Sequence, residues 1–273
     1  MSRKWEKEYK RYLDDENLSE IEIGKIMDKY RPGKIYRYMR FDDYWEKNIF
    51  EGQAYLSEAS KLNDPFDCLL NINQEIFAKH IFQMACEIFP YTDRRLLRET
   101  TKASVTSKLD ESLHNLKSQF RVACFTENND SPLMWAHYTD NHTGFCMEYD
   151  LTKLPEGYRY SILPVIYSNN RYDATRSVIA QKNLLTNPFY FKSSHWDYEK
   201  EWRLMIPANM VTDNEYYADF YNGISGIYFG LRSFEFHKEK IDKIIAEYSE
   251  RNIPVYKIVI EPYSYCIKSI QIN

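Results

Sequence analysis

The chain has 273 residues, of which 44% are hydrophobic and 28% charged, so a folded globular protein is expected and a disordered one is excluded. The formal net charge of -4 provides no general electrostatic attraction to nucleic acid. No apolar run approaches the ~20 residues of a membrane span, and the N-terminus lacks a signal-peptide core. We therefore expect a soluble, cytoplasmic protein without membrane contact.

The first third of the chain predicts helices around two short strands. A charged amphipathic helix or helix pair is expected over residues 5–30, and a Pro-Gly pair ends it. Strands are predicted over Lys34–Met39 and over residues 54–57, with a helix over residues 42–50 between them. From Gln74 to Ser118 the spacing of apolar residues becomes helical, which predicts two or three helices in a peripheral insertion at about residues 74–118.

The segment 122–150 predicts a strand, a polar turn, a short helix, a second turn and a second strand. Ser131 and Pro132 suit the N-cap and the first position of that helix. Further strands are expected over residues 161–167, 202–206, 224–229, 255–261 and 265–270, and further helices over residues 172–185 and 234–249.

Together these elements predict an α+β protein with a mixed β core. An N-terminal helical segment is expected over residues 1–33, followed by a single domain over residues 34–273 that contains the helical insertion. The strands at residues 34–39, 122–126, 145–150 and 202–206 are expected to meet in one core.

Histidines and cysteines give no metal signature. His137 and His142 are five residues apart, which does not place two ligands on one helix face. The five cysteines lack a C-x-x-C pair, so neither a zinc knuckle nor a disulfide framework is indicated. We expect the two histidines to form hydrogen bonds beside a core strand, and we predict no metal.

Two carboxylates stand out in the segment YEKEWR. Glu199 and Glu201 would lie on one face of a strand, because side chains alternate. Adjacent carboxylates repel each other, so one of them is expected to have a raised pKa. The pair suits acid-base chemistry or the binding of ribose hydroxyls. The competing interpretation is a solvated strand end with Glu–Arg pairs.

Basic and hydroxyl side chains occur on the two early strands. Arg37 lies between Tyr36 and Tyr38 and is suited to bind a phosphate through two hydrogen bonds, although an arginine at a sheet edge has the same pattern. Ser57 and Ser60 flank a strand-to-loop corner, where a serine either binds a ligand or caps a turn.

The order of four segments resembles a bacterial family known as domain of unknown function 2971. The segments are IYRYM, AYLSEASKLNDPFDC, ACFTENNDSPLMWAHYTDNHTGFCMEYD and YEKEWR. The resemblance extends from about residue 35 to about residue 270. The family's label implies no activity.

The order of an arginine strand, a serine strand and an E-x-E strand also resembles, more remotely, the R-S-E class of ADP-ribosyltransferases. That resemblance implies an ADP-ribosyltransferase-like fold with NAD as substrate. It assigns phosphate binding to Arg37, the ribose pocket to Ser57, transfer to Glu201, and the first acid of the pair to Glu199. Tyr36, Ser60, and the helix with His137 and Tyr138 would complete the NAD site.

The implied function is an NAD-dependent ADP-ribosyltransferase or NAD glycohydrolase, such as a toxin or phage-defence effector that modifies a protein or nucleic acid. The alternative is a non-enzymatic interaction module of a phage-defence or toxin–antitoxin system, with a cognate partner protein. A metal-dependent nuclease that uses His137 and His142 is the remaining, lesser alternative.

Overall fold

A mixed sheet organises the protein. The computed structural model describes residues 5–15, 17–180, 184–210 and 216–273, and their side chains except those of residues 106–114, 184 and 185. Within these residues the main sheet has nine strands. Their order is β15 (Ile267–Gln271), β14 (Val255–Ile260), β13 (Ile224–Phe229), β6 (Phe145–Asp150), β1 (Lys34–Met39), β5 (Phe120–Thr126), β11 (Glu201–Pro207) and β7 (Ile162–Pro164), with β3 (Ser57–Glu58) attached to β5.

The four strands that the sequence placed in one core are neighbours here, in the order β6, β1, β5, β11. Neighbouring strands pair antiparallel, except that β13 and β14 are parallel. The chain is therefore a mixed α and β protein, as predicted.

One edge of β5 is shared by two strands. β1 reaches it at Tyr36 and Thr126, and β3 reaches it at Ser57 and Val122. The middle of this edge of β5, between Val122 and Thr126, is therefore paired with neither β1 nor β3, which leaves an opening between these two strands. This opening positions the candidate site described below.

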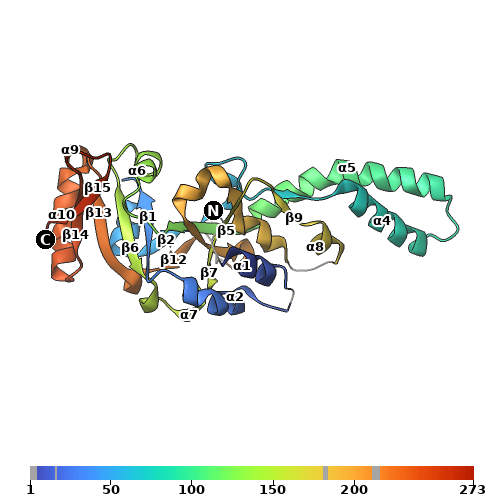
Figure 1. Ribbon diagram of the computed structural model, residues 1–273, viewed down its shortest axis with the longest axis horizontal. Helices are drawn as coiled ribbons and strands as arrows, with labels where there is room; N and C mark the ends of the chain where they lie inside the picture. The colour runs from blue at the N-terminus through green and yellow to red at the C-terminus, as the bar shows by residue number, and fades with distance from the viewer. Residues whose placement is uncertain (1–4, 16, 181–183, 211–215) are drawn as a thin grey trace.

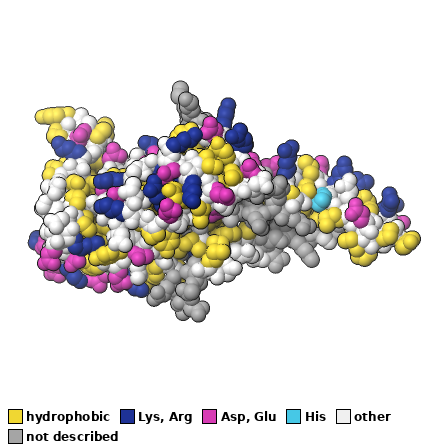
Figure 2. All heavy atoms as spheres, turned by 90° about the horizontal axis from the view of Figure 1, so that it is seen from below, with side chains coloured by type: hydrophobic (Ala, Val, Ile, Leu, Met, Phe, Trp, Pro, Cys, Tyr) yellow, Lys and Arg dark blue, Asp and Glu magenta, His cyan; other side chains and the backbone are white. Residues whose placement is uncertain are grey.

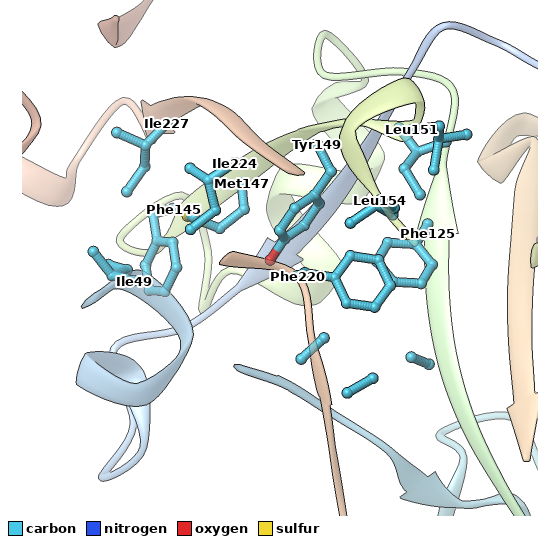
Figure 3. Close-up of a cluster of buried hydrophobic side chains, with 14 of the residues drawn as sticks. Ile49, Phe125, Phe145, Met147, Tyr149, Leu151, Leu154, Phe220, Ile224 and Ile227 are labelled. Atoms are coloured by element: carbon cyan, nitrogen blue, oxygen red, sulfur yellow. The ribbon is translucent and has the colours of Figure 1, made fainter. Parts of the chain in front are cut away.

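The two faces of the sheet pack against different clusters. Ile35 and Met147 face a large apolar core that also receives Ile244 and Tyr248 of α10 (Lys238–Glu250). In Figure 3, Phe125, Tyr149 and Phe220 meet in the same core from three different segments. Tyr38 and Cys146 face the opposite side, where they pack with Trp135 of α6 (Pro132–Tyr138).

The N-terminal segment, predicted as one helix or a helix pair, is a helix pair. α1 (Glu6–Leu13) is followed by α2 (Glu20–Met27). Ser19 and Glu22 form a reciprocal capping box that fixes the start of α2.

Two short predicted strands are each divided between different sheets. The strand expected over residues 54–57 becomes β2 (Gln53–Tyr55), which pairs with residues 217–219, and β3, which pairs with β5; the N–H of Leu56 extends the first ladder by donating to the carbonyl of Tyr216. The strand expected over residues 161–167 becomes β7, which pairs with β11, and β8 (Ile166–Ser168), which pairs with residues 191–193; the N–H of Val165 extends the β7–β11 ladder by donating to the carbonyl of Glu201.

Two predicted helices are also interrupted. In place of a helix from residue 172, Tyr172 and Asp173 form β9 (Tyr172–Asp173), and α8 (Thr175–Ile179) starts where Asp173 accepts a hydrogen bond from Thr175. Residues 181–183 of that prediction lie outside the described residues. The helix expected over residues 234–249 is divided at His237 into α9 (Ser233–Phe236) and α10.

The smaller pairings are β10 (Phe191–Ser193) with β8, β12 (Tyr217–Asp219) with β2, and β4 (Leu70–Asn71) with β9. Apart from the two helices of the insertion, which are described next, the remaining described helices of four residues or more are α3 (Trp45–Phe50), α7 (Glu156–Ser161), and the 3-10 helices η4 (Leu184–Tyr190) and η5 (Ser194–Glu199).

The helical insertion is a projecting pair of antiparallel helices. α4 (Gln74–Ile88) and α5 (Arg94–Ser118) extend away from the sheet in Figure 1, and we call this pair the arm. Asn73 and Asp93 cap the two helices through their side chains. Among the described residues, no helix is both long enough and apolar enough to cross a bilayer.

Candidate functional site

A pocket of about 180 Å³ lies at the opening of the sheet. Its lining comes from β1, β3, β5, α6, β10, η5, β11 and the loop before β4. The described residues that line it are Tyr36, Arg37, Tyr38, Ser57, Leu62, Asn63, Asp67, Val122, Cys124, Phe125, Thr126, Met134, Tyr138, Lys192, Glu199 and Glu201. Six residues that the sequence nominated are thus brought together: Tyr36, Arg37, Ser57, Tyr138, Glu199 and Glu201.

Arg37 belongs to the lining of the pocket, and its guanidinium packs on the sheet face of the large apolar core. Its Nη2 donates to the carbonyl of Tyr55 at 2.6 Å, and its guanidinium lies 5.8 Å from the centre of the Phe125 ring. Its Nη1 is buried and has no hydrogen-bond partner among the described residues. Burial lowers the pKa of Arg37. A buried, unused N–H on a cation is the kind of donor that an anionic ligand group would satisfy.

Glu199 and Glu201 do not lie in one strand, contrary to the expectation from alternation. Glu199 ends η5, and Lys200 has a left-handed backbone with φ of 45°, so β11 begins only at Glu201. Thr126 holds this corner, because its hydroxyl donates to the carbonyl of Glu199 at 2.5 Å. The two carboxylates still converge, through a shared cation.

That shared cation is Lys192 of β10. Its Nζ lies 2.5 Å from Glu199 Oε2, 3.1 Å from Glu201 Oε2 and 3.6 Å from Asp67 Oδ2. The side chain is nearly inaccessible to solvent, with 4% exposure. A buried lysine needs such carboxylate partners to keep its charge.

Arg203 completes the group. Its guanidinium binds Glu201 through Nε and Nη2 at 2.8 and 2.9 Å, and binds Asp67 through Nη1 and Nη2 at 3.0 and 2.6 Å. Both contacts are the two-bond, in-plane type that arginine forms with carboxylates. We call Asp67, Lys192, Glu199, Glu201 and Arg203 the charge network. It holds three carboxylates against two cations.

The network pushes the two glutamate pKa values apart. Burial, reinforced by the negative charge of Glu201, raises the pKa of Glu199 despite its contact with Lys192. Burial also acts to raise the pKa of Glu201, but Arg203 and Lys192 outweigh it, and this pKa lies well below its ordinary value. Glu201 is therefore held as an anion, and Glu199 is the more easily protonated of the two carboxylates.

Tyr138 connects Glu199 to the pocket mouth. Its hydroxyl donates to Glu199 Oε1 at 2.5 Å and accepts from the amide nitrogen of Asn63 at 3.3 Å. Burial, together with the negative charge of Glu199, raises the pKa of Tyr138. Ser131 caps α6 and sets the direction in which this helix presents Tyr138.

Other nominated residues lie elsewhere. His137 points to Trp196, with ring centres 6.2 Å apart, and is not among the described residues that line the pocket. Ser60 donates to the Glu58 carboxylate and is likewise outside the lining. His142 stacks on Trp135 with ring centres 6.5 Å apart. Within the described part of the chain, no group of three or more His, Cys, Asp or Glu side chains is arranged to hold a metal ion.

Sequence reasoning missed Lys192, Arg203 and Asp67 as members of the site. Lys192 follows three aromatic residues, Phe189 to Phe191, and a lysine within such a run was the available signal for a buried cation. Arg203 stands two residues after Glu201, so alternation itself places the two on one face.

A family model described as "Protein of unknown function (DUF2971)" matches residues 134–204. The match supports the resemblance to DUF2971. The matched segment runs from α6 into β11 and contains Tyr138, Lys192, Glu199, Glu201 and Arg203. No curated protein and no solved structure matches the chain.

Proposed function

We propose that the pocket binds NAD and that the protein is an ADP-ribosyltransferase-like enzyme. The observation that supports this is the convergence of Arg37, Ser57, Glu199 and Glu201 on one pocket, although they come from distant segments. These are the residue types that the R-S-E resemblance nominated from their order alone.

The electrostatics of the pocket suit a dinucleotide with a cationic ring. The charge network has one carboxylate in excess, and the tyrosines of the lining offer aromatic faces, so a positively charged planar ring is favoured beside Glu199. The nicotinamide ring of NAD⁺ carries such a charge. The unused Nη1 donor of Arg37 suits a phosphate oxygen.

The size of the pocket indicates which part of NAD enters. A volume of about 180 Å³ is below the ~300–1,000 Å³ of usual ligand pockets, so only part of the dinucleotide enters and the rest lies outside. We assign the nicotinamide ring and its ribose to the pocket.

The different pKa values of Glu199 and Glu201 suit them to different roles in cleavage of the bond between nicotinamide and ribose. When the bond between nicotinamide and ribose breaks, the ring keeps the bonding electron pair and positive charge develops on the ribose. Glu201, held ionised by Arg203 and Lys192, stabilises that charge. Glu199 takes the proton from the attacking group, which is water or a nucleophile of a protein or nucleic acid acceptor.

The test is nicotinamide release from NAD⁺ combined with calorimetric binding. Glu201→Gln is expected to reduce turnover by about 10²–10³ while NAD⁺ still binds, because it removes a charge that acts in the transition state. Arg37→Gln is expected to weaken NAD⁺ binding. His195→Ala, an exposed histidine outside the lining, is the matched control and should change neither quantity.

NADH provides a second comparison, because its dihydronicotinamide ring is neutral. We expect it to bind more weakly than NAD⁺. Absence of NAD⁺ binding by a well-folded wild type would refute the proposal.

A non-enzymatic interaction module is the second candidate, and the arm favours it. α4 has no buried residue, although more than half of its side chains are apolar. If the protein binds no NAD⁺, this exposed helix makes recruitment of a cognate partner protein the better interpretation.

A further inference from the structure

The arm contains one helix with more apolar surface than its neighbour can cover. Along α4, apolar residues recur at spacings of four, three and four in two adjacent rows. The first row is Phe77, Ile81, Met84 and Ile88, and the second is Ala78, Phe82, Ala85 and Phe89. Each row has the spacing of a seam between packed helices, so α4 is built for two helical neighbours.

Among the described residues α4 packs mainly against α5, it also contacts α8, and Phe77 packs against a neighbouring apolar cluster. The consequence is visible in the exposure: Ile76, Ile88 and Phe89 are 52%, 66% and 55% exposed. Ile88 and Phe89 lie at one end of the helix and Ile76 near the other, and the members of the two rows between them are only half-buried, so α4 has no fully buried apolar face.

A groove follows the second row. It lies between α4 and α5 and has a volume of about 760 Å³. Ala78 and Phe82 of α4 and Val105 of α5 form its apolar part, while Lys79 and Arg98 stand at its rim. Figure 2 shows hydrophobic side chains at the free end of the arm, beside Lys and Arg side chains.

The charge of the arm identifies the kind of partner. Residues 74–105 contain five Lys or Arg (79, 94, 95, 98, 102) and four Asp or Glu (75, 87, 93, 99), interleaved along both helices. A surface of one sign would favour a partner of the opposite sign, such as an anionic membrane. A balanced surface is complementary to itself.

We propose that the arms of two copies of this chain pack together as an antiparallel four-helix bundle about a two-fold axis. Each arm then supplies the second neighbour that α4 of the other arm lacks. If α4 pairs with α4 of the second copy about Gln83, Lys79 of each copy lies opposite Glu87 of the other. This inference does not depend on what the pocket binds.

The test is the oligomeric state of the full-length protein by sedimentation. Wild type is expected to be a dimer. Phe82→Glu is expected to raise the dimer dissociation constant at least ~100-fold, because the seam would bury an unpaired carboxylate. Ile260→Glu is the matched control, because Ile260 is also exposed, at 64%, but belongs to β14; it should leave the dimer unchanged. Equal melting temperatures would exclude misfolding of either variant.

Crosslinking tests the orientation. Cys86 lies one helical turn beyond Phe82 on α4. With the exposed Cys266 changed to Ser, a short bismaleimide is expected to join two chains through Cys86, and Cys86→Ser is expected to abolish the product.

A wild type that stays monomeric across a wide concentration range would overturn the proposal, even if its arm pelleted with anionic vesicles or bound another protein. A dimer that Phe82→Glu leaves intact would overturn it equally.

Discussion

The charge network and the arm reverse the usual distribution of side chains in opposite ways. The network buries five charged side chains beside the pocket, with Arg203 wholly inaccessible to solvent. The arm leaves much of α4 exposed, although its apolar residues are spaced as in a packed helix. One region holds charges where apolar groups are expected, and the other exposes apolar groups where charges are expected.

The difference lies in whether the groups have partners within the chain. Each member of the network contacts an opposite charge, mostly at hydrogen-bond distance, so burial is compensated. Among the described residues, α4 has only α5 and α8 as helical neighbours of note, and none of its own residues is buried. Buried ion pairs add little stability compared with apolar residues of the same shape, so their presence beside a pocket favours an electrostatic role there.

The largest expected effect is on stability, from Arg203→Met. This change leaves Asp67 and Glu201 buried without their main cation, and we expect the free energy of unfolding to fall by about 3–5 kcal/mol. Urea unfolding measures it. Arg232→Met removes an arginine whose side chain is 50% exposed and should change stability by less than about 0.5 kcal/mol. Similar values for the two variants would mean that the network is not the compensated cluster described above.

An intermediate effect is expected from Glu199→Gln, in the dependence of stability on pH. The pKa of Glu199 is higher in the folded state than in the unfolded state, where it is about 4.3. The contribution of Glu199 to the free energy of unfolding is therefore fully present below about pH 4.3 and is lost as the pH rises through the folded-state pKa. Glu201 has the opposite sign, because its lowered pKa adds stability above about 4.3 that is lost as pH falls through the folded pKa.

Wild type should therefore lose more stability than Glu199→Gln as the pH rises above about 4.3, with a slope of at most ~1.4 kcal/mol per pH unit from this group. Unfolding by urea at several pH values gives the slopes. Glu99→Gln, in which a carboxylate with 68% side-chain exposure is changed, should follow wild type. Parallel curves for wild type and Glu199→Gln would show that Glu199 is not the group that titrates.

The smallest effect is expected in the arm. Leu96 is 57% exposed, so Leu96→Gln should change the unfolding free energy of the dilute, monomeric protein by less than about 0.5 kcal/mol. By contrast Ile244→Ala removes a fully buried side chain of α10 and should cost about 2–5 kcal/mol. A large loss from Leu96→Gln in dilute solution would mean that the arm is packed within one chain.

The sequence by itself determined the elements whose pattern is local and long. Helical spacing identified the arm, and the segment 122–150 gave its strand, helix and strand because Ser131 and Pro132 mark the helix start. The nomination of Arg37, Ser57 and the two glutamates also came from the order of motifs in the chain.

Tertiary structure decided the rest, because hydrogen bonds between distant segments have no local signal. The two predicted strands divide at Leu56 and Val165 because the residues before and after each of them pair with different partner strands. The backbone turn at Lys200 moves Glu199 out of the strand, and only the folded chain brings Lys192 between the two carboxylates. Periodicity predicts which face a side chain takes, whereas the partner that sets its charge and its pKa is chosen by the packing of strands that are remote in sequence.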